Sequence, residues 1–466
     1  MPTTASHAET VTSAEALWRE HWCPIAFSID APPGRLHSVT VYDEPYVLFR
    51  DLDGAIHAFE DRCPHRLARL SDGRLRDGQI ECLYHGWRFD SEGACTHIPQ
   101  LEPDQALPSA ACVKKVHVTE RQGIVWLYAG DAVRPEASIP AIAELDAGDC
   151  HLVDFAIDLP YSHEFLIENV LDYAHIHIAH DGVRGGGDAA LAGPLAFEIS
   201  ESTAAGFRAQ LGRSIAGQLS SGELAAAHVS FDAPGLVHYR SIYPTGDHLD
   251  GASANGASAN GASATQRVSG LALYALPLGH SRCRLLYRAY SNFAPRRDRM
   301  RPRFWEHGSQ CHLLEQDMAI VTGQAANIAR IGGSLGTNWL PLKSSDALVV
   351  AYRAWLDEHA AGRPGYLGLR TRGASPASAA SAGGGLYQGR YLSHVRQCGS
   401  CQRAVRVAGV LRNASVVLCF ASLVAAVCLS SWLQTVAVAL AVVSFLAGVT
   451  SASLLTRLTG RGLVRD

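Results

Sequence analysis

Four residues in the first part of the chain combine two thiols with two imidazoles. Cys63 and His65 form a C-x-H pair, and Cys82 and His85 form a C-x-x-H pair. Such a set can hold a [2Fe–2S] cluster, in which the His ligands raise the reduction potential above that of an all-Cys cluster. Zinc is the alternative, but zinc fingers pair Cys with Cys and His with His. Because each arm here carries one of each, the pattern favours the cluster.

The segments around the two pairs predict strands. Runs rich in β-branched and aromatic residues occur at 37–50, which a turn signal at Asp43–Pro45 divides, and at 55–59, 79–82 and 123–128. This arrangement resembles a Rieske [2Fe–2S] domain. Rieske proteins of electron-transport chains carry a further Cys in each ligand loop, and neither loop does so here. The resemblance is therefore to the Rieske domains of oxygenases, and we expect an all-β domain at residues 18–131.

A second motif follows the cluster residues. Asn169, Asp172, His175 and His180 fit the frame N-x-x-D-x-x-H-x-x-x-x-H, which resembles the iron-binding motif of Rieske non-haem iron oxygenases. The resemblance implies that His175 and His180 bind a mononuclear Fe(II). Iron of this kind takes two imidazoles and one carboxylate on one face and keeps positions open for O2.

The spacing of this pair requires a departure from a regular helix. Residues five apart lie about 140° apart around an ideal α-helix, so His175 and His180 cannot share a metal on one. We expect a π-bulge, which has an i→i+5 period, or a helix break between them. On a regular helix, His177 and His180 would form the better pair, but the motif favours His175.

Asp172 lies one helical turn before His175 and on the same side. A carboxylate there can accept the second ring N–H of a ligating His and fix its tautomer. The resemblance further implies that Asp172 bridges to His85 or His65 of a neighbouring subunit. It also implies a head-to-tail ring, usually a homotrimer, that brings cluster and iron together.

The third iron ligand must come from a distant segment. From Pro302 the chain has helical composition, with an apolar stripe at helical spacing that comprises Leu313, Leu314, Met318, Ile320 and Val321. Asp317 falls within this stripe, where a buried carboxylate is costly unless it meets a cation. Glu306 and Glu315 are the competitors, and Glu315 points off the stripe. The family resemblance also places the carboxylate at Asp317.

Strand-like runs lie between these two helices, at 196–200, 229–231, 236–243, 271–276 and 284–292. They predict an antiparallel sheet covered by helices in a catalytic domain at residues 132–372. Repeated GASAN-like segments indicate a flexible insertion at 246–267. The fold class is therefore α+β, with the Rieske domain, this catalytic domain and a C-terminal helical hairpin.

A C-x-x-C pair, Cys398 and Cys401, lies in a segment predicted as a linker at 373–403. The pair can be a redox-switched disulfide, half of a metal site or two idle thiols. With no second pair nearby, a thiol switch is favoured, and thioredoxin is its expected partner.

The chain ends in a long uncharged segment. Residues 414–456 contain no charged side chain, which is enough for two membrane spans of about 20 residues each. We expect a membrane anchor at 404–466, with transmembrane helices at about 412–431 and 433–456 and a turn near Trp432. Arginines flank both ends, which places both on one side of the membrane. A buried helical hairpin in a soluble core is the alternative.

Composition excludes other classes. With 40 Lys and Arg against 44 Asp and Glu, the net charge is -4, so no basic face indicates nucleic-acid binding. The 12 Cys are scattered and do not form a secreted disulfide framework. Residues 1–17 lack the apolar core of a secretory signal and the Arg content of a transit peptide, and we expect them to be disordered.

These features occur together in one family. The Rieske and iron motifs, the C-x-x-C and the terminal hairpin resemble those of the pheophorbide a oxygenase group of plants, algae and cyanobacteria. The nearest resemblance within it is to the translocon-associated inner-envelope Rieske protein, a phyllobilin hydroxylase, and to a protochlorophyllide-linked relative. The likeness covers nearly the whole chain apart from the first dozen residues and the insertion. The similar stretches include 39–43, 60–71, 81–87, 98–101, 316–318 and 343–346.

The resemblance implies a monooxygenase that uses O2 to hydroxylate a chlorophyll-derived tetrapyrrole or phyllobilin. Since no nucleotide-binding fingerprint is evident, electrons must come from an external one-electron donor such as ferredoxin. Alternatives are pheophorbide a ring opening, chlorophyllide or protochlorophyllide oxygenation, and, in another class, a membrane-bound redox-sensing subunit of a protein-import complex. The implied location is a chloroplast inner-envelope, thylakoid or cyanobacterial membrane, in contact with membrane lipid, with the catalytic domain on the stromal or cytoplasmic side.

Overall fold

The computed structural model describes residues 19–460 except 103, 131–135, 184–185, 212–225, 244–265, 280, 361–365, 372–386 and 388. The predicted N-terminal segment 1–17, nearly all of the predicted insertion at 246–267, and the predicted boundaries after 131 and 372 lie outside the described residues. The chain divides into two compact units. The first contains Met1–Arg299 and Gln316–Gly385, and the second contains Met300–Glu315 and Leu386–Asp466.

The first unit begins with an antiparallel six-stranded sheet in the order β1-β10-β9-β4-β3-β2. Its strands are β1 (Cys23–Phe27), β2 (His37–Val41), β3 (Glu44–Arg50), β4 (Ile56–Glu60), β9 (Lys115–Arg121) and β10 (Ile124–Tyr128). The turn between β2 and β3 is at Tyr42 and Asp43, both with positive φ, and not at Asp43–Pro45 as predicted. The Asp and Pro suggested a turn, but the chain is already extended at Glu44.

A second antiparallel sheet, in the order β5-β6-β7-β8, carries the Cys/His segments. Its strands are β5 (Arg74–Arg76), β6 (Gln79–Glu81), β7 (Arg88–Phe89) and β8 (Cys95–His97). The two sheets enclose an apolar core that includes Phe49, Phe59, Leu70, Ile80 and Phe89, all fully buried. The all-β domain predicted from the sequence is confirmed.

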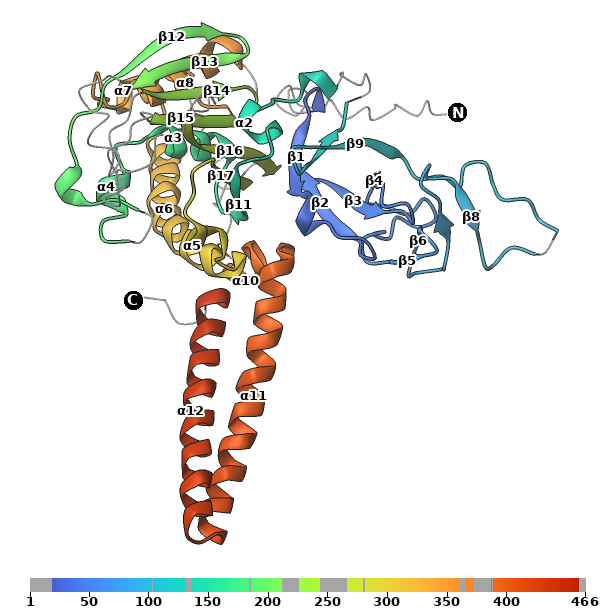
Figure 1. The fold of residues 1–466 in the computed structure, drawn as a ribbon. Helices are drawn as coiled ribbons and strands as arrows, with labels where there is room; N and C mark the ends of the chain where they lie inside the picture. The colour runs from blue at the N-terminus through green and yellow to red at the C-terminus, as the bar shows by residue number, and fades with distance from the viewer. Residues whose placement is uncertain are drawn as a thin grey trace, which may run out of the picture. The chain divides into compact units, whose positions relative to one another are not determined.

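The rest of the first unit is built on an antiparallel seven-stranded sheet in the order β11-β17-β16-β15-β14-β13-β12 (Figure 1). Its strands are β11 (His151–Leu159), β12 (Phe197–Thr203), β13 (Gly206–Leu211), β14 (Ala226–Asp232), β15 (Leu236–Tyr243), β16 (Arg267–Gly279) and β17 (Arg282–Ser291). Strands β12 and β14–β17 match predicted runs, whereas β11 and β13 were not predicted. The alternation of buried and partly exposed residues in β11 is visible only once its pairing with β17 is known.

Helices cover this sheet. Helix α3 (His163–Leu171) packs against β15, β16 and β17, and it contacts α8 (Ala347–His359). Helix α6 (Arg303–Ile331) is a long helix that begins in the second unit and continues in the first. The shorter helices are η1 (Ser28–Asp30), η2 (Glu136–Ser138), α2 (Ala143–Asp146), α4 (Ile176–Ala179), η3 (Ala189–Leu191), α5 (Arg296–Arg299) and α7 (Leu335–Asn338).

The second unit contains the start of α6, then α10 (Arg390–Ser393), η5 (Val395–Gln397), α11 (Gly399–Cys428) and α12 (Trp432–Thr459). Helices α11 and α12 lie side by side as a hairpin (Figure 1). Helix α11 begins before the predicted span at 412–431, and α12 ends after the predicted span at 433–456, so the two spans stay predictions within longer helices. Of the predicted linker at 373–403, residues 373–386 and 388 lie outside the described residues. Its last five residues, 399–403, belong to α11.

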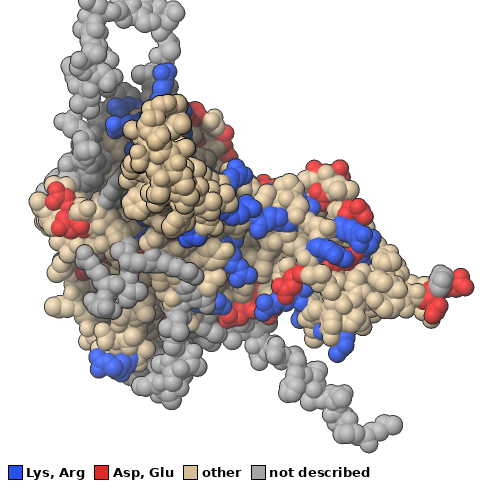
Figure 2. Space-filling view, turned by 90° about the horizontal axis from the view of Figure 1, so that it is seen from below, with Lys and Arg blue, Asp and Glu red and all other residues tan. Residues whose placement is uncertain are grey.

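The hairpin is suited to a membrane. Both helices are long and apolar enough to span one. Small residues lie between them, since Ala408, Ser415, Ala426, Ala441 and Ser444 are buried, as is usual where transmembrane helices approach closely. The large apolar side chains face outward. In Figure 2, which looks at the hairpin from its turn, the projecting end carries no Lys, Arg, Asp or Glu colouring.

Candidate active site

The two Cys/His loops of the small sheet have the same backbone hydrogen bonds. In the first loop the Cys63 N–H donates to the carbonyl of Ala68, and the Leu67 N–H donates to the carbonyl of Cys63. In the second loop the Cys82 N–H donates to the carbonyl of Trp87, and the Gly86 N–H donates to the carbonyl of Cys82. Leu67 and Gly86 both have positive φ, 60° and 76°. The two loops therefore present their Cys and His residues in matching ways, although only one has the expected glycine.

The four side chains gather between the loops. Cys63 and Cys82 are each 2% exposed, and burial raises the pKa of the Cys63 thiol to about 11, with Cys82 adding to the effect. The rings of His65 and His85 have centroids 4.4 Å apart. Trp87 stacks on His65 at 4.6 Å. Two buried cysteines next to a pair of imidazoles fit a bound cluster whose irons supply positive charge.

Two buried carboxylates, Glu81 and Asp61, support the loops. Glu81, which precedes Cys82, is buried and contacts Arg74 and Arg88. Burial opposes ionisation of Glu81, but the two arginines outweigh it and lower its pKa to about 2. In the first loop, the buried carboxylate of Asp61 accepts hydrogen bonds from the backbone and hydroxyl of Ser71 at 2.7 and 2.5 Å. Both loops are thus anchored beside their Cys residues.

The segment after α3 carries the predicted iron ligands. Helix α3 ends at Leu171, and the one-turn helix α4 follows, with His175 as its N-cap and His180 as its C-cap. Of the two predicted irregularities, the structure has the helix break and not the π-bulge. The single helical turn of α4 ends after Ala179, so His180 lies outside the helix. His180 leaves the helical conformation, at φ -114° and ψ 26°, and this redirects its side chain.

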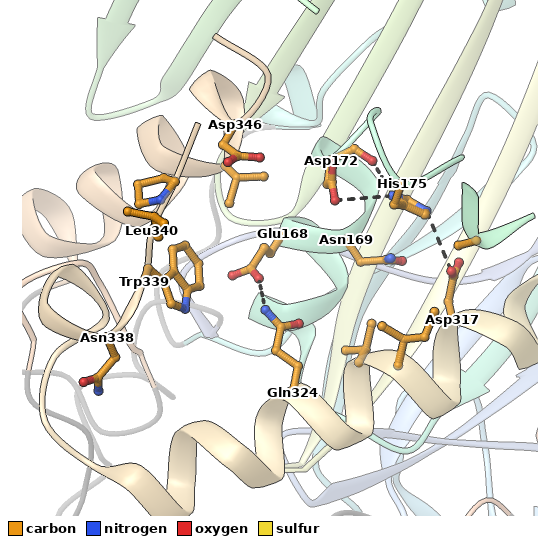
Figure 3. A pocket seen from close by; sticks show the side chains of 15 residues that line it. Glu168, Asn169, Asp172, His175, Asp317, Gln324, Asn338, Trp339, Leu340 and Asp346 are labelled. Atoms are coloured by element: carbon orange, nitrogen blue, oxygen red, sulfur yellow. Dashed lines mark hydrogen bonds and ion pairs between the residues drawn. The ribbon is translucent and has the colours of Figure 1, made fainter. Parts of the chain in front are cut away.

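Three donor groups converge at this point. The Nε2 atoms of His175 and His180 lie 3.7 and 3.2 Å from Oδ1 of Asp317 on α6. All three ligand atoms lie within 4.8 Å of one another. His180 and Asp317 are 1% and 3% exposed, and Nε2 of His180 has no hydrogen-bond partner among the described residues. Figure 3 shows Asp317 pointing from α6 toward His175. A buried, partnerless imidazole nitrogen next to a carboxylate and a second imidazole fits a metal ion.

A cavity of about 390 Å³ opens beside these donors. Its polar side includes Asn169, Asp172 and Gln324, and its apolar side includes Trp339 and Leu340 (Figure 3). Its volume is in the usual range for ligand pockets. The three donors can therefore meet a bound molecule of moderate size.

Comparisons with known proteins agree with this geometry. The family model "Rieske [2Fe-2S] domain" matches residues 21–117, and the model "Pheophorbide a oxygenase" matches residues 231–334. The chain is 32% identical over 428 residues to Protein TIC 55 of Arabidopsis thaliana. The aligned region covers 86% of this chain and 75% of that protein. The chain belongs to the pheophorbide a oxygenase family of Rieske oxygenases.

Further relatives share a smaller part of their sequence with this oxygenase. It is 28% identical over 413 residues to the pheophorbide a oxygenase of rice, Oryza sativa subsp. japonica, covering 83% of this chain and 73% of that protein. It is also 28% identical over 449 residues to flavonoid 8-hydroxylase 2 of Ocimum basilicum, covering 92% and 82%. Dicamba monooxygenase, a solved structure, shares the fold, with a TM-score of 0.58 at 20% identity over 73% of this chain and 97% of that one. The Rieske domain supplies a [2Fe–2S] cluster, the three converging donors fit a mononuclear iron, and as a member of this family the oxygenase uses O2.

Asp172 of the oxygenase contacts His175 differently from the prediction. Its backbone carbonyl, and not its carboxylate, accepts a hydrogen bond from Nδ1 of His175. The carboxylate lies 3.7 Å from that nitrogen and accepts a hydrogen bond from the Ala174 N–H at 3.0 Å. The carbonyl is available because α3 ends here. Burial raises the pKa of the Asp172 carboxyl group, and the negative charge of Asp346 raises it further. His175 acts in the opposite direction but does not cancel the shift.

Gln316 is a site residue that the sequence did not reveal. Its Oε1 lies 3.0 Å from Nδ1 of His180, so this nitrogen donates and leaves Nε2 directed at Asp317. Burial lowers the pKa of His180, but Asp317 and Gln316 outweigh it, so the pKa is raised. His177, the alternative ligand, points elsewhere and accepts a hydrogen bond from the Asp188 N–H. Gln316 lies next to Asp317 in the family-like stretch 316–318, but the sequence indicates no role for its side chain.

The surroundings of Asp317 agree in part with the predicted stripe. Leu314, Met318 and Val321 are buried, whereas Ile320 is 57% exposed and lines the cavity. The competing acids are paired elsewhere, because Glu306 contacts Arg301 and Glu315 contacts Arg390. Asp317 is thus the carboxylate that meets the two imidazoles.

A buried ion-pair network holds α3 in place. Arg353 of α8 is fully buried and donates to Glu168 at 2.6 Å and to the carbonyl of Leu367 at 2.7 Å. Glu164 lies 3.8 Å from the same guanidinium. Gln324 of α6 donates to Glu168 at 2.7 Å. The network connects the helix that precedes His175 with the helix that carries Asp317.

The remaining predicted site residues, Cys398 and Cys401, lie in the second unit. Both are buried and carry free thiols. Cys398 is the N-cap of α11, and Cys401 lies in its first turn.

Proposed function

We propose that this oxygenase hydroxylates a chlorophyll-derived tetrapyrrole or a linear bilin. The observation that carries the proposal is that His175, His180 and Asp317 converge at the cavity. Iron(II) held by two imidazoles and one carboxylate keeps positions open for O2 and supplies the oxygenating chemistry. The substrate class is supported by the relatives that are named pheophorbide a oxygenase and chlorophyllide a oxygenase.

The side chains of the cavity have distinct tasks. The apolar side, with Trp339, Leu340 and Ile320, would receive the flat apolar face of a conjugated ring system. Asn169 and Gln324 on the polar side would meet carbonyl or carboxylate groups of its periphery. Gln316 keeps His180 in the tautomer that directs Nε2 at the metal position, and the carbonyl of Asp172 does the same for His175.

The remaining partners follow from the same proposal. An external one-electron donor of the ferredoxin type would reduce the cluster. A homotrimer would bring His85 or His65 of one subunit close to Asp172 of the next. The two apolar helices would anchor the chain in a chloroplast membrane, with the catalytic domain on the stromal side. The chloroplast location is supported by the relatives, whose names include "chloroplastic".

A single-turnover assay tests the substrate class. The chemically reduced holoenzyme is mixed with O2 and, separately, with a phyllobilin, pheophorbide a, chlorophyllide a, protochlorophyllide or a flavone, and products are identified by mass spectrometry. We expect one product that gains an oxygen atom, formed only with a member of the tetrapyrrole or bilin set. Product with the flavone alone, or with none of the five compounds, would reject the proposed class.

The redox-sensing alternative predicts a vestigial iron site. The convergence of all three donors argues against it, because a buried carboxylate without a cation is costly. Iron analysis separates the two functions. The oxygenase needs a mononuclear iron in addition to the cluster, and a sensor needs the cluster only.

A further inference from the structure

The second unit contains another set of converging ligand atoms. His307 lies in the second turn of α6, His394 lies between α10 and η5, and Cys398 and Cys401 begin α11. One ligand atom from each of these four residues lies within 4.8 Å of the other three. All four side chains are buried, between 0% and 3% exposed. The set is separate from the cluster and from the iron ligands, and the function proposed above does not use it.

The distances within this set match a tetrahedral ion. Nδ1 of His307 lies 3.1 Å from Nε2 of His394 and 3.4 Å from each sulfur. Nε2 of His394 lies 3.2 Å from the sulfur of Cys401. Zinc binds sulfur at about 2.3 Å and imidazole nitrogen at about 2.0–2.1 Å. Tetrahedral angles then separate the donor atoms by roughly 3.3–3.8 Å, so the observed spacing is close to that of a zinc site.

Hydrogen bonding alone explains this arrangement poorly. A neutral imidazole carries one N–H, and its other nitrogen is an acceptor. Nδ1 of His307 faces a second ring nitrogen and two sulfurs at once, and one proton on this atom cannot serve all three directions. A single cation accepts the lone pairs of all four atoms together. The same reasoning holds for Nε2 of His394, which faces His307 and Cys401.

The surroundings resemble those of a closed structural site. Val395, Ala404 and Leu458 form an apolar cluster with the two cysteines, and Phe304 and Leu454 pack against it. Four protein ligands and an apolar shell leave no position for water or substrate, which is typical of structural zinc and not of catalytic zinc. The two thiols and two imidazoles also suit zinc better than magnesium or calcium, which prefer oxygen ligands.

We propose that His307, His394, Cys398 and Cys401 bind one structural zinc ion. Three of the ligands come from one short segment, and His307 comes from 87 residues earlier in the chain. The ion would therefore join the start of α6 to the base of the α11–α12 hairpin. The C-x-x-C is then half of a metal site, and the expected thiol switch with thioredoxin as partner is replaced by a pair of zinc-bound thiolates.

Metal analysis of the full-length protein in detergent tests this proposal. The protein is purified without added zinc and analysed for zinc and iron, and the zinc-edge X-ray absorption spectrum gives the ligand atoms. We expect about one zinc per chain, in addition to the iron, bound by two sulfur and two nitrogen atoms. This measurement needs no variant. A chain without zinc, or zinc bound mainly by oxygen, would overturn the proposal.

Substitutions locate the ion. We expect Cys398→Ser and His307→Asn to lose most of the zinc while the EPR signal of the [2Fe–2S] cluster is retained. The controls are Cys428→Ser at the other end of α11 and His312→Asn on the exposed side of α6, and both should retain zinc. Unchanged zinc in Cys398→Ser would contradict the site. If protein purified without oxidant contained no zinc and had a Cys398–Cys401 disulfide, the zinc proposal would be rejected in favour of the thiol switch.

Discussion

At the scale of single residues, the proposed iron site depends on how each imidazole is oriented. His175 is held by a backbone carbonyl and His180 by a side-chain amide. Each bond fixes the tautomer, so that the second ring nitrogen faces Asp317. Such partners are often as important for metal affinity as the ligands themselves. Only the His180 contact can be removed by mutation without moving the backbone.

Gln316→Leu therefore tests the orientation of His180. Removing its amide leaves Nδ1–H without its acceptor and frees the ring to rotate. We expect the affinity for Fe(II) to fall by about 10- to 100-fold, with the cluster unaffected. The affinity is measured by competition with a chelator, and Gln210→Leu, at an exposed position of β13, is the control. Equal affinities in both variants would show that Gln316 has no role in binding.

The sequence indicated the ligands better than it indicated what orients them. His175, His180 and Asp317 were predicted from a motif and from a carboxylate within an apolar stripe, and the structure brings them together. The carbonyl of Asp172 could not be predicted, because it is free only where α3 happens to end. The role of Gln316 depends on the distance between α4 and α6, which local sequence does not contain.

At the scale of elements, the position of α3 depends on Arg353. This guanidinium neutralises Glu168 and lies near Glu164. Burial raises the pKa of Glu164 to about 7, although the charge of Arg353 opposes this shift. The network lies immediately before the proposed iron ligands. Sequence periodicity predicted the helix that corresponds to α6 but not α8. The pair of Glu168 and Arg353 could not be predicted because these residues are 185 positions apart.

Arg353→Met should strongly destabilise the first unit. It leaves the buried carboxylates without their cation, and breaking a buried pair in this way costs about 3–5 kcal/mol. We expect a clearly lower melting temperature by tryptophan fluorescence. Arg297→Met, which removes an arginine whose side chain is 80% exposed, should melt like the wild type. A melting temperature for Arg353→Met equal to that of this control would refute the structural role of the network.

His238 of β15 makes the sheet sensitive to acid. Burial lowers its pKa to about 4, despite Glu144 nearby, and Tyr290 contacts its Nε2 at 2.8 Å. In the unfolded state, His238 has a pKa near 6.5 and takes up a proton below that pH. In the folded state, its imidazole stays neutral until the pH approaches about 4. Stability should fall as the pH drops from about 6.5 to about 4, by up to about 1.4 kcal/mol per unit.

His238→Gln should remove this part of the acid sensitivity. The variant is compared with the wild type by melting at about pH 7 and about pH 5. We expect the decrease in melting temperature between the two pH values to be smaller for the variant than for the wild type, whatever the stability of the variant at neutral pH. An equal loss in both proteins would mean that His238 does not titrate as the structure indicates.

At the scale of the whole molecule, the chain joins an oxygenase to an apolar hairpin. Arginines flank both ends of the hairpin in the sequence, whereas its turn carries no charged residue. The positive-inside rule predicts that both ends lie on one side of the membrane and the turn on the other. We therefore expect the parts of the chain before α11 to share the side of the arginines.

Cysteine labelling in sealed vesicles tests this topology. Cys428 is exposed at the end of α11, and Cys112 is exposed in the Rieske domain. A membrane-impermeant maleimide should reach Cys112 from one side and Cys428 only from the other. Cys428→Ser and Cys112→Ser identify the two signals. Labelling of both residues from the same side would rule out a hairpin that spans the membrane.

The central claim is that electrons from the [2Fe–2S] cluster are used for O2 chemistry at the iron held by His175, His180 and Asp317. The most direct measurement is ¹⁸O incorporation from ¹⁸O2 in a single turnover of reduced enzyme, comparing the wild type with Asp317→Ala. The account predicts labelled product from the wild type and none from Asp317→Ala, with the same cluster EPR signal in both. Equal labelled product from the two proteins would contradict it.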